Sequence, residues 1–148
     1  MMPSAGNHIG FEIGFARDEQ EVEVAAELFN SLFDPLTGEH VNTDEYSRLL
    51  NERQIIVARD ADGAFLGAAH VRRAGRVTEL VHLAVVPAAR RRGVGRALCD
   101  YMVECCRNDE KSRFVLFTQA DNEKALSLYQ GKGFALTGKA SLSMVRQA

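Results

Sequence analysis

Apolar positions along the chain change from one spacing to another, and these changes predict where its first elements lie. Alternate apolar residues from Ile9 to Arg17 predict a first strand. From Val22 to Phe33 the apolar residues recur at helical spacing, with Asp18 placed to cap the helix. We expect the Asp34-Pro35 pair to end this helix, because the residue before a proline disfavours helical backbone.

A second short helix and three strands are expected next. We expect Thr43 to cap the helix, which should run to Leu50. The first two strands form a hairpin around Asp62-Gly63, and the third is apolar on both faces, as a central strand covered on two sides would be. In chain order the three strands span Gln54–Arg59, Phe65–Val71 and Val77–Val86.

Beyond Pro87 the pattern alternates helices with strands. We expect a helix that starts near Val94, has an apolar stripe from Val94 to Cys105 and includes Cys106. A strand over Arg113–Thr118, a helix over Asn122–Lys132, and short strands over Phe134–Leu136 and Leu142–Val145 follow. Hairpins in the first half and crossovers in the second predict an α/β fold of the α+β type. Its mixed, mostly antiparallel sheet has about six to seven strands, with helices on both faces. No repeat or linker divides residues 1–148, so we expect a single domain with the order β-α-α-β-β-β-α-β-α-β-β.

The composition is that of a globular protein. Apolar residues make up 46% of the chain and charged residues 26%, which excludes a disordered chain. No apolar run approaches the ~20 residues of a membrane helix, and Met1 to Gly10 lacks the layout of a signal peptide. We therefore expect a cytoplasmic protein with no membrane partner.

The three cysteines form no metal-binding pattern. Cys99, Cys105 and Cys106 lie in one expected helix, without a C-x-x-C pair or a nearby histidine. Cys99 and Cys106 share a face of that helix, where we interpret them as buried apolar thiols, a redox role being the less favoured alternative. No metal is expected.

Acidic and basic side chains are unevenly divided along the chain. Residues 1–60 carry twelve acids and four bases, a net charge of −8, whereas residues 61–148 carry eight acids and fourteen bases, a net charge of +6. This division suggests a basic half for an anionic ligand and an acidic half for a cationic one. Solvated surface on both halves is the alternative that composition leaves open.

The strongest local signal is the turn Arg90-Arg91-Arg92-Gly93-Val94-Gly95, which Arg96 continues into a helix. Glycines let the backbone turn tightly and approach a ligand, and the N-terminus of the helix directs free N–H groups at the turn. With four arginines, the turn favours a phosphate-bearing ligand. The dinucleotide fingerprint would need a third glycine where Leu98 stands, and the Gly-Lys-Ser/Thr of the P-loop is absent.

Strand, turn and helix together resemble motif A of the GNAT superfamily of N-acetyltransferases. The run from Glu79 to Pro87, followed by Arg90-x-x-Gly93-x-Gly95-Arg96-Ala97-Leu98, carries this resemblance. Downstream, Asn122-x-x-Ala125-x-x-x-Tyr129-x-x-x-Gly133-Phe134 is similar to motif B of the same family. The first 60 residues match the family only in the order of their elements.

The resemblance implies an N-acetyltransferase that takes acetyl-CoA as co-substrate and passes the acetyl group directly to a primary amine. In the family the central strand is bulged and splays from the next strand, so the backbone of Leu83, Ala84 and Val85 would hold the pantetheine arm. An amide near Leu83 would stabilise the oxyanion, which is typically worth ~3 kcal/mol. The turn from Arg90 to Arg96 would hold the pyrophosphate. Asn122 would hydrogen-bond the pantetheine or pyrophosphate, although it also suits a helix N-cap.

Two side chains are implied in the chemistry itself. Glu79 stands where some family members have a glutamate base, and Tyr129 matches the general acid that protonates the departing thiolate. A surface carboxylate and a core aromatic are the respective alternatives. The base could also be His82 or a water, but simple strand alternation puts His82 on the face opposite Glu79.

The acceptor is expected on the acidic side of the molecule. Its charged residues favour a cationic amine, either a small molecule or a peptide: Asp34, Glu39, His40, Asp44 and Glu45. A homodimer is common in the family. A non-catalytic acyl-CoA-binding sensor or partner subunit is the main alternative. Nucleic-acid binding through Arg90–Arg96 is disfavoured by the net charge of −2 and the absence of tryptophan.

Overall fold

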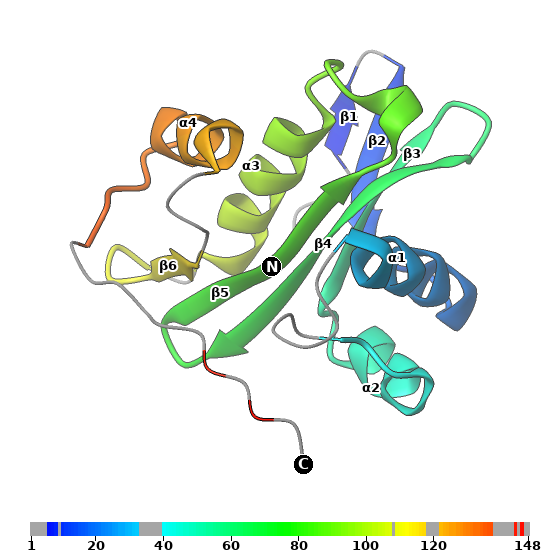
Figure 1. The fold of residues 1–148 in the computed structure, drawn as a ribbon, viewed down its shortest axis with the longest axis horizontal. Helices are drawn as coiled ribbons and strands as arrows, with labels where there is room; N and C mark the ends of the chain where they lie inside the picture. The colour runs from blue at the N-terminus through cyan, green and yellow to red at the C-terminus, as the bar shows by residue number, and fades with distance from the viewer. Residues whose placement is uncertain are drawn as a thin grey trace.

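A six-stranded sheet organises the part of the chain that the structure describes, which comprises residues 6–8, 10–32, 40–107, 109–117, 122–137, 144 and 146. Figure 1 shows this computed structural model. The elements in chain order are β1 (Gly6–His8), β2 (Phe11–Phe15), α1 (Glu19–Leu32), the 3-10 helix η1 (Thr43–Glu45), α2 (Tyr46–Asn51), β3 (Ile55–Asp60), β4 (Phe65–Ala74), β5 (Val77–Val85), the 3-10 helix η2 (Pro87–Ala89), α3 (Val94–Cys106), β6 (Arg113–Leu116) and α4 (Glu123–Gly131).

The strands lie in the sheet in the order in which they occur in the chain. Neighbours from β1 to β5 pair antiparallel, whereas β5 and β6 are parallel. Parallel neighbours need a long crossover connection, and α3 supplies it. The mixed, mostly antiparallel sheet expected from the sequence is confirmed.

Helices cover both faces of the sheet, and each face has its own apolar core. Residues of α3, among them Leu98 and Met102, pack with Ile13, Ile56 and Val71 on one face. On the other face, α1 and α2 pack on β3 to β5 through a second set of apolar residues, which includes Val22, Phe29, Leu49, Val57 and Ala84. Figure 1 shows α3 and α4 on one side of the sheet and α1 and α2 on the other.

The first turn of α1 is fixed by polar contacts. Asp18 caps it as expected, since its Oδ1 accepts a hydrogen bond from the Glu21 amide at 2.9 Å. The Glu21 carboxylate accepts two more from Arg59, at 2.5 and 2.7 Å, and Arg59 is only 2% exposed. This buried ion pair joins the start of α1 to β3.

Several boundaries differ from the sequence-based expectations. The strand expected over Ile9–Arg17 is the shorter β2, and an additional strand, β1, precedes it; Gly10, with a left-handed φ of +84°, turns the chain between them. Thr43 begins η1 rather than capping it: Asn42 is the cap, and its amide donates to Glu45 Oε2 at 2.8 Å. The Asp34-Pro35 pair lies outside the described residues.

The C-terminal strand over Phe134–Leu136 was predicted wrongly. These residues follow α4 without strand structure, and the Phe134 amide instead bonds to the Tyr129 carbonyl at 3.0 Å. Phe134 therefore packs back on the helix, where its ring meets that of Tyr129 edge-on. The second predicted strand, over Leu142–Val145, lies outside the described residues apart from Met144, as does the Thr118 end of the β6 prediction.

Candidate active site

The central strand β5 parts from β6 halfway along its length. The two strands pair only from Val77 to Leu80, opposite Arg113 to Leu116. Beyond this point β5 continues to Val85 without a β6 partner among the described residues. The pairing of the described residues thus ends where the splay predicted from the sequence would begin.

A β-bulge in β5 lies just after the last residue of this strand that pairs with β6. His82 pairs with His70 of β4 and Leu80 pairs with Val71, so Val81 is an extra residue on β5. The extra residue reverses the alternation of side chains, which places Glu79 and His82 on the same face, the one covered by α1 and α2. The expectation that they lie on opposite faces was wrong, because it assumed an unbroken strand.

The glycine turn adopts a backbone shape suited to an anion. Arg91 and Gly93 are both left-handed, with φ of +67° and +81°, and Gly93 caps α3. Alternation of left-handed and other conformations points successive N–H groups toward one concave side. The positive end of α3 reinforces that side.

A pocket opens beside this turn. It is lined by Val85 and Ala89, by Arg90, Arg91 and Gly93 to Arg96 of the turn, and by Leu128 of α4. A Cβ on Gly95 would stand 3.9 Å from both Leu128 Cδ2 and Val85 Cγ2, and 4.0 Å from Leu83 Cδ2. Only hydrogen occupies this point at Gly95, so the turn, the open end of β5 and α4 share one apolar recess.

Not all of the other residues predicted to bind the cofactor lie beside this pocket. Leu83 and Val85 lie on the recess side, whereas Ala84 is buried on the opposite face. Asn122 caps α4, accepting from the Ala125 amide at 3.2 Å. Arg92 does not line the pocket: its Nη2 donates to the Gly10 carbonyl at 3.3 Å.

Leu128 was missed by sequence reasoning. It precedes Tyr129 on α4 and is partly exposed, although leucine is usually buried. A leucine at helical spacing from Ala125, on the pocket side of a helix, is the signal that could have found it. Its Cδ2 supplies the wall of the recess opposite β5.

The comparisons with known proteins agree with this geometry. A family model described as "Acetyltransferase (GNAT) family" matches residues 22–134. The chain belongs to the GNAT acetyltransferase family. This match confirms the resemblance of the two motifs, which both lie inside the matched range.

Individual GNAT relatives differ in how much of their length they share with the chain. Mycothiol acetyltransferase of Beutenbergia cavernae is 35% identical over 80 residues, which are 53% of this chain and 27% of that protein. The N-terminal acetyltransferase B complex catalytic subunit naa20 of Schizosaccharomyces pombe is 31% identical over 118 residues, 73% of this chain and 64% of that one. The aligned stretches thus span less than two thirds of either relative.

Solved GNAT structures share the fold. The structure of yncA from Salmonella typhimurium with its cofactor acetyl-CoA has a TM-score of 0.68 and 22% identity, and the match covers 86% of this chain and 81% of that one. At this identity the similarity establishes the fold, and the acetyl-CoA belongs to that protein.

Glu79, on the face of the sheet that α1 and α2 cover, is held by an ion pair. Its Oε1 lies 3.5 Å from Nη1 of Arg72, the residue opposite it on β4, and its side chain is 31% exposed. Glu79 pairs with Val115, so it stands one residue before the last paired position of β5 and β6. The carboxylate therefore lies next to the splay and remains accessible.

Tyr129 lies inward on α4. Burial, with a smaller contribution from the nearby Cys99 thiol, raises the pKa of Tyr129 to about 12. The phenol accordingly keeps its proton throughout the neutral range, as a proton donor must. Its ring packs on the same apolar core as Leu83 and Val85.

The two histidines on the sheet face that α1 covers are enclosed. His70 and His82 are each 4% exposed, and the Phe29 ring stacks on His82 with a centroid separation of 5.0 Å. His70 Nε2 lies 3.1 Å from Gln54 Oε1. Burial lowers the pKa of His70 to about 3, with the charges of His82 and Arg72 as smaller causes, so His70 is neutral.

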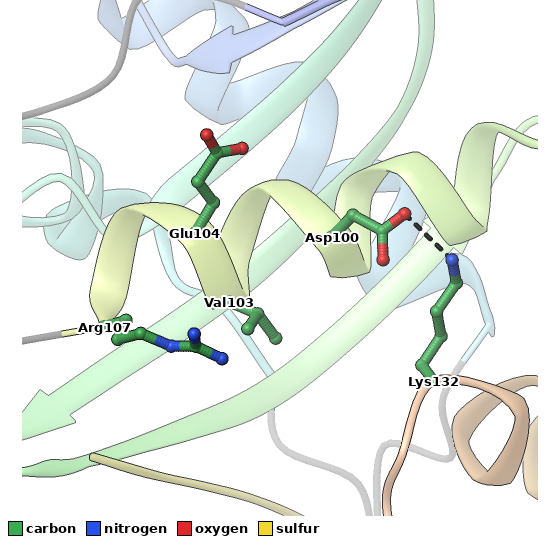
Figure 2. A pocket seen from close by; sticks show the side chains of 5 residues that line it. All are labelled: Asp100, Val103, Glu104, Arg107 and Lys132. Atoms are coloured by element: carbon green, nitrogen blue, oxygen red, sulfur yellow. Dashed lines mark hydrogen bonds and ion pairs between the residues drawn. The ribbon is translucent and has the colours of Figure 1, made fainter. Parts of the chain in front are cut away.

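Another hollow lies on the outer side of α3, away from the glycine turn (Figure 2). Lys132 reaches across it to Asp100, with Nζ and Oδ2 2.9 Å apart, and Val103, Glu104 and Arg107 complete the lining. None of the site residues predicted from the sequence is among them. The described residues include no group of three or more His, Cys, Asp or Glu placed to hold a metal, and none of their helices could span a membrane.

Proposed function

We propose that the chain is an acetyl-CoA-dependent N-acetyltransferase that passes an acetyl group directly to a primary amine in a ternary complex. The observation that carries the proposal is the junction at Gly95, where the basic turn meets the end of β5 that has no β6 partner among the described residues. Membership of the GNAT family and the acetyl-CoA in a structure of the same fold support it.

The turn and β5 divide the acetyl-CoA between them. Amides of the turn and the guanidiniums of Arg90, Arg91 and Arg96 suit the pyrophosphate. The recess between Leu83, Val85 and Leu128 suits the pantetheine arm, which would run along the edge of β5 beyond its pairing with β6. Asn122 stands at the start of α4, where its role as N-cap leaves the amide group of its side chain as a donor.

The proposed proton transfers use two side chains, Glu79 of β5 and Tyr129 of α4, which lie on opposite sides of the sheet. Glu79 accepts a proton from the acceptor ammonium, so that the free amine attacks the thioester carbonyl. The Leu83 amide stabilises the oxyanion that forms there. The carbon–sulfur bond then breaks as Tyr129 gives its proton to the thiolate, and the proton that the attacking nitrogen loses on becoming an amide restores the phenol.

Glu79 suits the base better than His82. A base must reach the acceptor amine directly or through a water. Glu79 is accessible and adjacent to the splay, whereas His82 is enclosed beneath Phe29. With His82 as base, Phe29 would have to move first.

The acceptor is tested with an amine panel. We propose that the acceptor is a cationic amine, because residues 1–60 carry a net charge of −8. Asp44 and Glu45, in the first turn of η1, belong to this acidic segment. Thermal-shift measurements with acetyl-CoA present select amines, and release of the CoA thiol then measures turnover. Acetyl-CoA binding without thiol release on any amine would favour the non-catalytic alternative.

A further inference from the structure

Arg92 stands apart from the other arginines of the turn. Arg90, Arg91 and Arg96 line the pocket, whereas Arg92 turns away and donates from Nη2 to the carbonyl of Gly10 at 3.3 Å. Gly10 forms the left-handed turn between β1 and β2. The contact therefore joins the cofactor turn to a hairpin 82 positions away in the sequence.

The turn needs an external contact because its anion-binding shape is locally unfavourable. Arg91 holds a φ of +67°, which residues with a Cβ seldom adopt. Gly93 is also left-handed, so Arg92 lies between two reversals of the backbone. A side chain that is anchored between them restrains both.

The Arg92 guanidinium lies close to the position that a Cβ on residue 10 would take. A Cβ on Gly10 would stand 3.1 Å from Arg92 Nη2, which is closer than nearly all real contacts of a Cβ. Glycine thus permits both the left-handed turn and the approach of the guanidinium. The neighbouring glycine turn at the same end of the sheet, at Gly63 between β3 and β4, has a φ of +85° but no atom within 4 Å of a Cβ.

We propose that Arg92 is a positioning residue that clamps the cofactor turn to the β1–β2 hairpin, so that this hairpin tunes the affinity for acyl-CoA. The inference rests on the proposed function, since it concerns the same pocket. It assigns Arg92 a different role from its neighbours: they attract the phosphates, and Arg92 holds the backbone that presents the amides.

Calorimetric titration with acetyl-CoA tests the proposal without knowledge of the acceptor. Arg92→Gln should raise the dissociation constant about three- to tenfold, the range expected for one ordinary hydrogen bond, because the contact is exposed to solvent. Its dependence on salt should stay as in the unaltered protein. Arg90→Gln is the contrast: it removes a charge from the pocket, so the salt dependence should weaken.

A pair of glycine variants separates the clamp from general destabilisation. Gly10→Ala and Gly63→Ala force alanine into nearly identical left-handed turns, so both should lower stability by similar amounts. Only Gly10→Ala should raise the dissociation constant. Combined with Arg92→Gln, its effect should be less than the product of the two single effects, because both break one contact.

Three results would overturn the clamp: unchanged affinity of Arg92→Gln, a loss of salt dependence equal to that of Arg90→Gln, or multiplicative effects of Gly10→Ala and Arg92→Gln. If the unaltered protein bound no acetyl-CoA, the proposed function would fall and the clamp with it. Normal binding by the unaltered protein and by Arg92→Gln alike would overturn the clamp alone.

Discussion

The two faces of β5 are built in contrasting ways. On the α3 face, Leu83 and Val85 border a recess that remains open because Gly95 has no side chain. On the α1 face, Ala84 and His82 are buried, and Phe29 covers His82. One face presents backbone and empty space, the other packed side chains.

This contrast indicates how the cofactor and the acceptor would be recognised. A cofactor common to a whole family can be bound by main-chain amides and glycines, which many sequences can supply. An acceptor differs between enzymes and must be selected by side chains on the opposite face. Four predictions test this division, from the largest expected effect to the smallest.

Filling the open face should have the largest effect. Gly95→Glu places a carboxylate between Val85, Leu83 and Leu128, where it blocks the recess and repels phosphate. We expect affinity for acetyl-CoA to fall by at least ~100-fold in calorimetric titration, an effect of ~3 kcal/mol or more.

Gly131→Glu is the matched control, since Gly131 lies at the end of α4 with no atom within 4 Å of a Cβ. It should bind acetyl-CoA normally. Equal binding by both variants would place the cofactor elsewhere and contradict the central proposal.

On the acceptor face, Glu79→Gln should lower kcat by about 100-fold, the usual contribution of a general base. Acetyl-CoA affinity should be unchanged, because the carboxylate points to the face that the cofactor does not use. Arg72→Gln removes its ion-pair partner but keeps the base, so its kcat should fall less. A normal kcat in Glu79→Gln would leave His82 or a water as the base.

Tyr129→Phe tests the acid on the cofactor face. Loss of the proton donor should lower kcat about tenfold to 100-fold while acetyl-CoA affinity changes little. The ring packing on Phe134 is retained, so the melting temperature should hold. Thiol-release kinetics measure the turnover, and weakened cofactor binding with unchanged kcat would show a packing role instead.

Burial of His70 on the α1 face predicts that the stability of the fold depends on pH. The pKa of His70 is about 3 in the folded protein and 6.5 unfolded, so the unfolded chain binds the extra proton first. Its stabilising contribution is complete above pH 6.5 and is lost as the pH falls toward 3, by up to ~1.4 kcal/mol per pH unit.

Denaturant unfolding between pH 6.5 and 5 measures this slope. His70→Phe should flatten it, whereas the variant of an exposed histidine, His40→Gln, should keep the wild-type slope. An unchanged slope in His70→Phe would assign the acid sensitivity to other groups.

Local signals predicted the elements well where periodicity is strong. The helix of α3 and the hairpin at Gly63 follow from short segments, and both form at the expected places. The strand predicted over Phe134–Leu136 is absent: the chain turns back at the end of α4, where the Phe134 amide bonds to the Tyr129 carbonyl and the two rings pack together.

The site shows the same limit. Arg90 and Arg92 look equivalent in the sequence, yet one lines the pocket and the other reaches Gly10. The opposite faces expected for Glu79 and His82 depended on strand parity, which the bulge at Val81 reverses. A bulge arises from pairing with another strand, so the sequence of β5 alone does not reveal it.

The glycine turn from Arg90 to Gly95 could be located from the sequence alone, because its glycines and arginines act through local backbone conformation and charge. The sequence also determined the family, through two motifs of fixed spacing. Only the tertiary structure decided which face each β5 side chain occupies, which helix closes the recess with Leu128, and where Arg92 is anchored. These depend on contacts between segments distant in the chain, whose partners no local pattern specifies.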